Sequence, residues 1–272
     1  MIPVDGHTMR EIAPRFSGEL AERQDAIITA VGPVLATTLE AYEIDNRLRI
    51  AHFLAQTCHE SAGFRTTEEF ASGQGYEGRA DLGNTQPGDG PRYKGRGLLQ
   101  LTGRANYRRI GAALGVDLEA NPELAGQPVL SLKIACEFWK RNEINPLCDD
   151  DDVVGVTRKV NGGKNGLAER SALTGKAKAA IARIEAFMLA GQRPAAGNLP
   201  LLRRGSNGEA VGDLQRLLRD RGFSLAVDED FGAATELAVT SFQDRFGLEA
   251  DGIVGAVTWA ALASPLGASA EH

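Results

Sequence analysis

The chain has 272 residues, of which 43% are hydrophobic, and a formal net charge of −6 at pH 7. This length allows one large domain or two smaller ones, each with a real hydrophobic core. The acidic balance argues against a nucleic-acid-binding protein, and the absence of an apolar run of membrane-spanning length argues against insertion into a membrane.

The N-terminal segment lacks the basic and apolar regions of a secretory signal peptide. We therefore expect the protein to be made and kept in the cytoplasm. The odd number of cysteines, three, fits reduced thiols rather than a disulfide framework. Cys58 adjoins His59 and Glu60, which suggests a nucleophile, but its place on an apolar helical stripe favours a small buried residue.

Residues 46–62 are predicted to form an amphipathic helix that ends near Glu60. Its apolar positions recur at spacings of three and four, and a second stripe is polar. This polar stripe is typical either of a groove lining or of a solvated face, and it consists of His52, Gln56 and His59. Residues 131–141 and 172–190 are also predicted helices. The first 190 residues therefore read as mainly α-helical.

Residues 71–97 differ from their surroundings, because they contain eight glycines and two prolines. We predict a long loop or lobe over a cleft, since long structured loops in compact domains are often functional. Residues 191–200 hold two prolines, two glycines and almost no charge, which is typical of a linker. The predicted domains are therefore residues 1–190 and 201–266.

The second domain contains an internal repeat, in which residues 227–239 align with residues 250–262 at a shift of 23. Asp228 matches Asp251, Gly232 matches Gly255 and Thr235 matches Thr258. Each copy reads as a turn, a glycine and a threonine at the start of a helix. Together with the amphipathic segment around residues 211–223, the repeat predicts a small three-helix domain.

This tail closely resembles the type 1 peptidoglycan-binding domain over nearly its whole length. The resemblance rests on the segments LQRLL, DGIVG and TW and on the spaced glycines around them. One departure is Glu229, since a glycine usually follows the aspartate there, and we expect one turn to be altered. Most of the matching residues are expected to build the fold, with wall contacts left to exposed polar groups near the turns.

The first domain resembles family 19 glycoside hydrolases, the chitinase-like group that includes phage and bacterial lysozymes. Four separated segments occur in the order of that family: AHFLAQTCHESAGF, Glu69, YKGRGLLQLTGRANY and VNGGKNGLAER. The resemblance implies a lysozyme-like helical domain with a deep cleft. The nine-residue spacing of the two glutamates resembles the lysozyme branch rather than plant chitinases, which favours the bacterial cell wall over chitin.

The same resemblance implies roles for individual residues. Glu60 corresponds to the general acid, Glu69 to the general base and Thr102 to a hydroxyl that positions the attacking water. The residues expected to bind substrate or to flank the carboxylates are His59, Gln100, Asn106, Tyr107, Asn161 and Arg170. Glu68 is the rival of Glu69 as base and Glu77 a weaker one. The choice of Glu69 rests mainly on the family spacing.

The chemistry of glycoside hydrolysis agrees with these roles, because it needs one protonated and one ionised carboxyl group. Glu60 follows an apolar helical segment, and partial desolvation would favour its protonated form. Glu69 lies in a polar stretch and can stay ionised. An inverting reaction requires a water between carboxyls about 6.5–9.5 Å apart, and the family resemblance implies inversion.

Other sites are disfavoured by the sequence. A zinc-protease motif needs a histidine three residues after Glu60, where Gly63 stands instead. The aspartates 149–152 lack the spacing of a calcium loop and fit a solvated loop or a helix N-terminus. The run 161–166 lacks the ending of a phosphate-binding loop. No cofactor or metal ion is expected.

We therefore interpret the chain as a monomeric, modular peptidoglycan hydrolase, a phage-type endolysin that acts as a muramidase. It would be stored in the host bacterial cytoplasm until its release to the cell wall, without inserting into the membrane or binding nucleic acid. Two alternatives remain open: a chitinase that cuts N-acetylglucosamine polymers, and a wall-binding protein whose catalytic domain has decayed.

Overall fold

A computed structural model describes residues 1–189 and 200–263 of the chain. The predicted linker, apart from its last residue, lies outside the described residues. Within them the chain is mainly helical, with isolated β-bridges and no strand, which confirms the predicted fold class. No described helix is both long and apolar enough to cross a lipid bilayer.

The chain divides into two compact units. The catalytic unit, as we call the first, comprises residues 12–179 with Met1, and the second comprises residues 2–11 with the described residues from 180 onward. The division falls within a long helix, whereas the sequence suggested a boundary at residue 190. That boundary stays a prediction, because residues 190–199 lie outside the described part.

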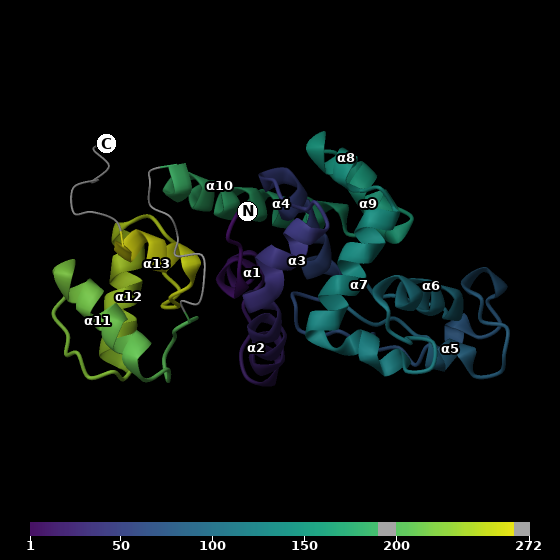
Figure 1. Cartoon of the computed structure of the whole chain (residues 1–272), viewed down its shortest axis with the longest axis horizontal. Coiled ribbons are helices and arrows are strands. Elements are labelled where there is room, and N and C mark those ends of the chain that lie inside the picture. Colours follow the sequence, from purple (N-terminus) through teal and green to yellow (C-terminus); the bar gives the residue numbers. More distant parts are fainter. Residues whose placement is uncertain (190–199, 264–272) are drawn as a thin grey trace. The chain divides into compact units, whose positions relative to one another are not determined.

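Figure 1 shows the order of the helices along the chain. The first ten helices are α1 (Gly6–Ile12), α2 (Glu19–Val31), α3 (Leu35–Ala41), α4 (Arg47–Glu60), α5 (Asp89–Arg92), α6 (Arg104–Leu114), α7 (Pro128–Arg141), α8 (Asn145–Asp149), α9 (Val153–Asn161) and α10 (Leu167–Leu189). Short 3₁₀ turns are η1 (Gly32–Val34), η2 (Gln74–Tyr76), η3 (Ala80–Leu82) and η4 (Pro122–Gly126).

Helix α4 is the central helix of the catalytic unit. Asn46 caps its N-terminus by accepting a hydrogen bond from the backbone N–H of Arg49 at 2.9 Å. Every residue from Ile50 to Cys58 is buried, so the helix is enclosed on all sides. Burial raises the pKa of the Cys58 thiol to about 12, which agrees with an inert core residue.

The predicted polar stripe of α4 is wrong in one respect, because His52 and Gln56 are fully buried rather than groove-lining or solvated. His52 is paired through Nε2 with Asp151 Oδ1 at 2.9 Å. Burial lowers the pKa of His52 despite this carboxylate. The stripe was predicted to line a groove or to face water, but here His52 and Gln56 each have a polar partner from a distant segment.

The chain turns sharply after α4, and this turn sets the position of the next acidic residues. Ala62, Gly63 and Phe64 all have positive φ angles, of 52°, 83° and 60°. A Cβ atom on Gly63 would lie 2.8 Å from Cγ of Pro14, so only glycine fits there. Ala62 and Phe64, the two residues of this left-handed run that are not glycine, store backbone strain beside Glu60, a feature common at functional sites.

The glycine-rich segment 71–97 is an ordered lobe built of short helical turns, not an open loop. The carboxylate of Glu77 accepts hydrogen bonds from the backbone N–H groups of Gly88 and Gly90 at 2.7 and 2.8 Å. Asn84 bridges the carbonyl of Tyr76 and the N–H of Arg104. Since both oxygens of Glu77 hold the lobe together, this rival for the catalytic base has a structural role.

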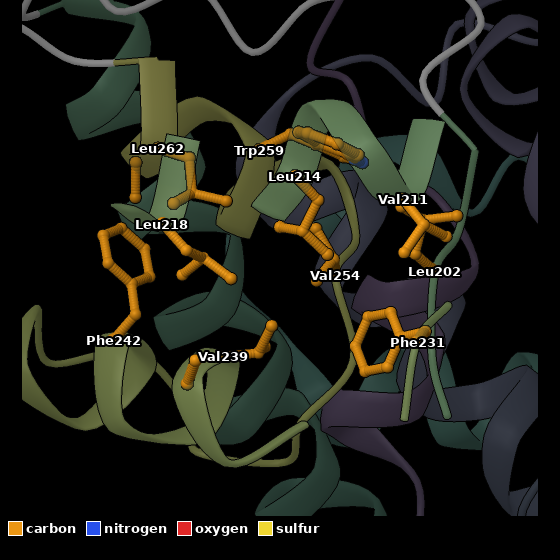
Figure 2. Close-up of a cluster of buried hydrophobic side chains, with 12 residues drawn as sticks. Leu202, Val211, Leu214, Leu218, Phe231, Val239, Phe242, Val254, Trp259 and Leu262 are labelled. Carbon is orange, nitrogen blue, oxygen red and sulfur yellow. The ribbon is translucent and has the colours of Figure 1, made fainter. Parts of the chain in front are cut away.

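The tail folds into three helices, as predicted: α11 (Glu209–Asp220), α12 (Ala233–Arg245) and α13 (Ala256–Ala263). They enclose the apolar cluster drawn in Figure 2, in which Leu214, Phe231 and Val254 face one another. Gly232 and Gly255 precede α12 and α13, so the sequence repeat is also a repeat of turn and helix.

Two buried glutamines organise the two copies of this repeat in the same way. Gln215 Nε2 donates to Asp228 Oδ1 at 2.7 Å, and its Oε1 accepts from the N–H of Glu229 at 3.0 Å. In the second copy Gln243 bonds with Asp251 and Gly252 at 2.9 and 2.8 Å. In each copy a buried side-chain amide thus supplies the turn with both a donor and an acceptor.

Glu229 does not change the conformation of its turn, because its φ of +61° is close to the +74° of Gly252 in the second copy. A left-handed backbone at a residue other than glycine carries strain. We predict that Glu229→Gly raises the free energy of unfolding of the tail by about 1 kcal/mol, since a left-handed conformation costs L-residues about this much. Calorimetry of the full chain would show the tail transition about 4–8 °C higher.

Gly252→Ala is the matched control for Glu229→Gly. It should lower the tail transition, because it introduces strain and places a Cβ 3.1 Å from Glu236 Cγ. If Glu229→Gly lowered the transition instead, packing of the Glu229 side chain over Gly212 would outweigh the relief of strain.

Candidate active site

Glu60, the predicted general acid, ends helix α4 and forms an ion pair with Arg170 of helix α10. The Arg170 side chain is only 2% exposed and that of Glu60 19%. The guanidinium NH2 group donates to Glu60 Oε1, while its NH1 group donates to Gln56 Oε1. The prediction of a carboxyl beside an apolar helix omitted this ion pair.

A buried polar network surrounds Arg170. Its Nε donates to the carbonyl of Asn165 at 3.1 Å, and the Gln56 amide donates to the hydroxyl of Thr157 at 3.4 Å. Helices α4, α9 and α10 and the turn between α9 and α10 thus meet at one guanidinium. Each of its three nitrogens donates to an acceptor in this network, so the packing around Arg170 determines the position of Glu60.

Glu69, the predicted base, lies on the segment that returns from the turn after α4. Its backbone N–H donates to the carbonyl of Gly95 at 3.0 Å, and the N–H of Gly95 donates to Glu69 Oε1 at 2.9 Å. The phenol of Tyr76 donates to Oε2 at 2.9 Å. Two neutral donors thus hold the carboxylate in one orientation without a cation.

Glu68, the rival base, is held in a different way. Its Oε1 lies 2.8 Å from Lys94 Nζ and 3.5 Å from Arg96 NH2. It therefore balances two cations of the neighbouring segment. This geometry favours Glu69 as the base. The carboxylate of Glu69 faces neutral polar groups, and such groups can also form hydrogen bonds with a sugar or a water.

Gln100 and Thr102 meet Glu69 around Gly95. A Cβ atom on Gly95 would lie 2.8 Å from Gln100 Oε1, 3.3 Å from Glu69 Cδ and 3.3 Å from Thr102 Oγ1. Any side chain there would displace these groups, so glycine is needed for their approach. Gln100 itself has φ +52°, so it is a further strained residue in the site.

Gln100, Thr102 and Asn106 line one pocket of 220 Å³. Thr102 donates to the carbonyl of Gln100, and the Asn106 amide donates to the carbonyl of Thr102, at 2.9 and 2.8 Å. The predicted water-positioning residue, Thr102, and two predicted substrate-binding residues, Gln100 and Asn106, are therefore joined in one chain of hydrogen bonds.

Tyr107 differs from its predicted place in the cleft wall, because its side chain is fully buried. Its hydroxyl donates to the carbonyl of Lys94 at 2.7 Å and accepts from Arg96 at 3.2 Å. Burial raises the pKa of Tyr107 to about 12. Tyr107 thus supports, from within the core, the segment that carries Gly95.

His59 and Asn161 both belong to the surroundings of Glu60. His59 Nδ1 lies 3.0 Å from Glu169 Oε2, and its ring packs so closely on Gly166 that a Cβ there would lie 2.4 Å from His59 Cε1. Asn161 closes the 161–165 turn through its amide, which donates to Asn165 O and accepts from Gly163 N–H. Both residues order the turn that positions Arg170.

Aspartates that precede α9 form ion pairs and a helix cap within the protein. Asp149 pairs with Arg49 at 2.6 Å, and Asp151 pairs with Lys178 at 2.7 Å. Asp152 caps α9 by accepting from the N–H of Gly155 at 2.8 Å. Among the described residues no group of three or more possible metal ligands occurs.

Comparison with known proteins identifies the larger unit. Residues 21–160, more than half of the chain, match the family described as chitinase class I, glycoside hydrolase family 19. The chain belongs to this family. Residues 207–262 match the family described as putative peptidoglycan binding domain. The chain is thus a glycoside hydrolase with a C-terminal peptidoglycan-binding domain.

The match with this family 19 hydrolase covers different shares of the length of its relatives. A glycosyl hydrolase family 19 domain-containing protein of Haemophilus influenzae is 32% identical over 177 residues, which cover 54% of this chain and 86% of that protein. Chitinase 8 of Oryza sativa is 36% identical over 132 residues, but the match covers only 48% of that protein.

A solved structure agrees in fold. The family 19, class IV chitinase from Zea mays superposes with a TM-score of 0.50 at 24% sequence identity, covering 68% of this chain and 93% of that one. At this identity the likeness concerns the fold alone. It supports the predicted lysozyme-like helical fold.

Two residues of the candidate site, Tyr76 and Gly95, were not singled out by the sequence, and both hold Glu69. Gln56 was noted only as part of the polar stripe of α4, and its contact with Arg170 was not predicted. The only feature of the sequence that could have indicated one of these residues is the tyrosine within the glycine-rich lobe, because an aromatic residue in such a segment needs a packing or binding reason. Nothing in the spacing of Gln56 and Arg170, 114 residues apart, indicates their contact.

We predict that Tyr76→Phe lowers the turnover of glycan about tenfold, because Glu69 loses one of its two donors. Burial, and then the hydrogen bond to Glu69, raises the pKa of Tyr76, so the phenol remains a donor at neutral pH. The measurement is kcat and KM across pH. A change in kcat with KM retained would support orientation of Glu69, whereas unchanged kcat would contradict it.

Proposed function

We propose that the chain is an inverting N-acetylmuramidase that cuts the glycan strands of bacterial peptidoglycan and serves as a phage-type endolysin. The proposal rests on one observation: a family 19 hydrolase unit and a peptidoglycan-binding domain occur in the same chain. A domain that binds the wall raises the local concentration of its glycan without changing the chemistry.

The roles proposed for the two glutamates follow from their surroundings. Arg170 binds Oε1 of Glu60, which leaves Oε2 to carry the proton to the leaving oxygen. Glu69 keeps a fixed carboxylate between Gly95 and Tyr76 and removes a proton from the attacking water. Thr102, beside Gly95, orients that water. Acid and base act on opposite sides of the bond, which inverts the anomeric centre.

Chitin hydrolysis is the second candidate, because plant relatives such as Chitinase 8 are named for it. The same acid and base would cut either polymer. Selection between the two polymers would depend on the residues around the reacting sugar and on the tail domain. A wall-binding protein without activity is a weaker candidate, since both carboxylates are present and held by ordered partners.

One digestion experiment tests the proposal. Purified peptidoglycan and N-acetylglucosamine oligomers are incubated with the full chain, and the new reducing ends are identified by mass spectrometry. N-acetylmuramic acid at the new end supports a muramidase, and N-acetylglucosamine there indicates a glucosaminidase. Cleavage of the oligomers alone would establish a chitinase. The anomer observed by NMR directly after cleavage tests inversion.

The role of the tail is tested separately. A chain that ends at residue 200 should keep its activity on soluble glycan but lose binding to intact cell walls by on the order of a hundredfold. Unchanged co-sedimentation with walls would mean that the tail is a spacer. We propose that the protein is a monomer held in the host cytoplasm until lysis. Lysis of cells that express it with and without a membrane-permeabilising partner would test this setting.

A further inference from the structure

The pocket that contains Gln100, Thr102 and Asn106 extends well beyond these predicted residues. Its remaining lining comes from η3, from the segment that carries Gln100, from helices α6 and α7, which pack against each other, and from the end of α9. These additional residues are apolar, amide or basic: Leu82, Leu99, Leu101, Ile110, Phe138, Asn142, Val160, Arg109 and Arg141. No carboxylate lines it, so the pocket joins the site of Glu69 to a region of positive charge.

The two arginines differ in how far their charge is balanced. Arg109 donates to the neutral amide oxygen of Asn106 at 2.6 Å, a bond that does not offset a charge. Arg141 pairs with Glu137 at 2.6 Å. The pocket therefore retains a net attraction for an anion, and a guanidinium can bind a carboxylate through two parallel hydrogen bonds.

The shape of the pocket restricts the anion. Its volume of 220 Å³ is smaller than the range typical of drug-sized ligands, so it suits a short substituent rather than a run of sugars. Leu82, Leu99 and Phe138 offer apolar contacts beside the arginines. The matching group is a short chain with methyl or methylene groups and a carboxylate.

The two candidate polymers differ in whether they carry such a carboxylate. Chitin carries hydroxyl and N-acetyl groups and no charge. Every second sugar of peptidoglycan carries a lactyl group, whose carboxylate is either free or joined to a peptide with carboxylates of its own. An arginine-lined pocket continuous with the groups around Glu69 discriminates between these polymers, since the anion would gain charge-assisted hydrogen bonds that chitin lacks.

We propose that Arg109 and Arg141 bind the carboxylate of the lactyl or peptide substituent on the muramic sugar and so select peptidoglycan over chitin. This inference rests on the proposed function, because it assigns a place to a group that only peptidoglycan has. Arg109 is expected to contribute more than Arg141, since its charge is not balanced by a carboxylate.

The test compares Arg109→Gln and Arg141→Gln with Arg108→Gln in the full chain. Arg108 lies on the same helix and is paired with Glu119 at 2.5 Å, outside the pocket, so it controls for the loss of one charge. Substrates are glycan strands with intact peptides, the same strands after removal of the peptides by an amidase, and N-acetylglucosamine hexamer. Arg109→Gln should raise KM for the anionic strands about tenfold more than for the hexamer.

The two anionic substrates distinguish the source of the carboxylate. A KM effect on both strands indicates the lactyl group itself, and an effect on peptide-bearing strands alone indicates the peptide. An equal effect of Arg109→Gln on anionic strands and neutral hexamer would overturn the proposal. So would an effect of Arg109→Gln no larger than that of Arg108→Gln.

A binding measurement separates this inference from the proposed function. Calorimetry with N-acetylmuramyl-L-alanyl-D-isoglutamine, N-acetylmuramic acid and N-acetylglucosamine needs no turnover. Preference for the muramyl ligands, lost about tenfold in Arg109→Gln, supports the pocket even if digestion shows a different bond to be cut. Equal affinity for charged and neutral ligands would refute the pocket, while muramidase activity in the digests would leave the proposed function standing.

Discussion

Glu60→Gln is expected to lower the rate of glycan hydrolysis about a thousandfold while the chain stays folded and bound to the wall. Glutamine keeps the oxygen that accepts from Arg170, so the buried network is retained. It has no proton to give to the leaving oxygen, so the chemical step loses its acid. Release of reducing sugar from peptidoglycan measures the effect, and co-sedimentation with walls together with circular dichroism controls for binding and fold.

The neighbouring pair of glutamates offers a matched comparison for the base. Glu69→Gln should lower activity to a similar extent as Glu60→Gln, because the amide cannot remove a proton from water. Glu68→Gln should keep most of the activity, since Glu68 balances Lys94 and Arg96 at the side of the site. If Glu68→Gln were inactive and Glu69→Gln active, the two roles would be exchanged.

The sequence predicted those features that depend on local pattern. The apolar spacing of residues 46–62 predicted α4, which runs from Arg47 to Glu60, and the 23-residue repeat predicted the paired turns of the tail. Resemblance placed Glu69, Gln100 and Thr102 in one site, and the structure brings these three together around Gly95. In each case the information lies within a short window or a motif.

The sequence could not reveal features that depend on burial and on distant contacts. His52 and Gln56 occupy the polar stripe of α4, yet both are buried because Asp151 and Arg170 reach them from about a hundred residues away. Tyr107 was expected in the cleft but lies beneath it. Periodicity shows which residues share a face, and it does not show whether a polar partner covers that face.

Arg170→Leu is expected to lower the free energy of unfolding of the catalytic unit by about 3 kcal/mol. Removal of one partner of a buried ion pair leaves Glu60 uncompensated and Gln56 without its donor. In calorimetry of the full chain the transition of the catalytic unit should fall by about 10 °C, while the tail transition stays in place. Arg158→Leu, an exposed arginine on α9, serves as control and should change stability by less than about 0.5 kcal/mol.

A double-mutant cycle shows whether Arg170 stabilises the fold through Glu60. The cost of Arg170→Leu is measured in the natural chain and again in Glu60→Gln, where the charge of the partner is gone. If the ion pair carries the effect, the second cost should be smaller by about 1–3 kcal/mol. Equal costs would mean that Arg170 acts instead through Asn165 and the turn between α9 and α10. In the first case the buried guanidinium supports the acid directly; in the second it orders the turn that carries Asn161.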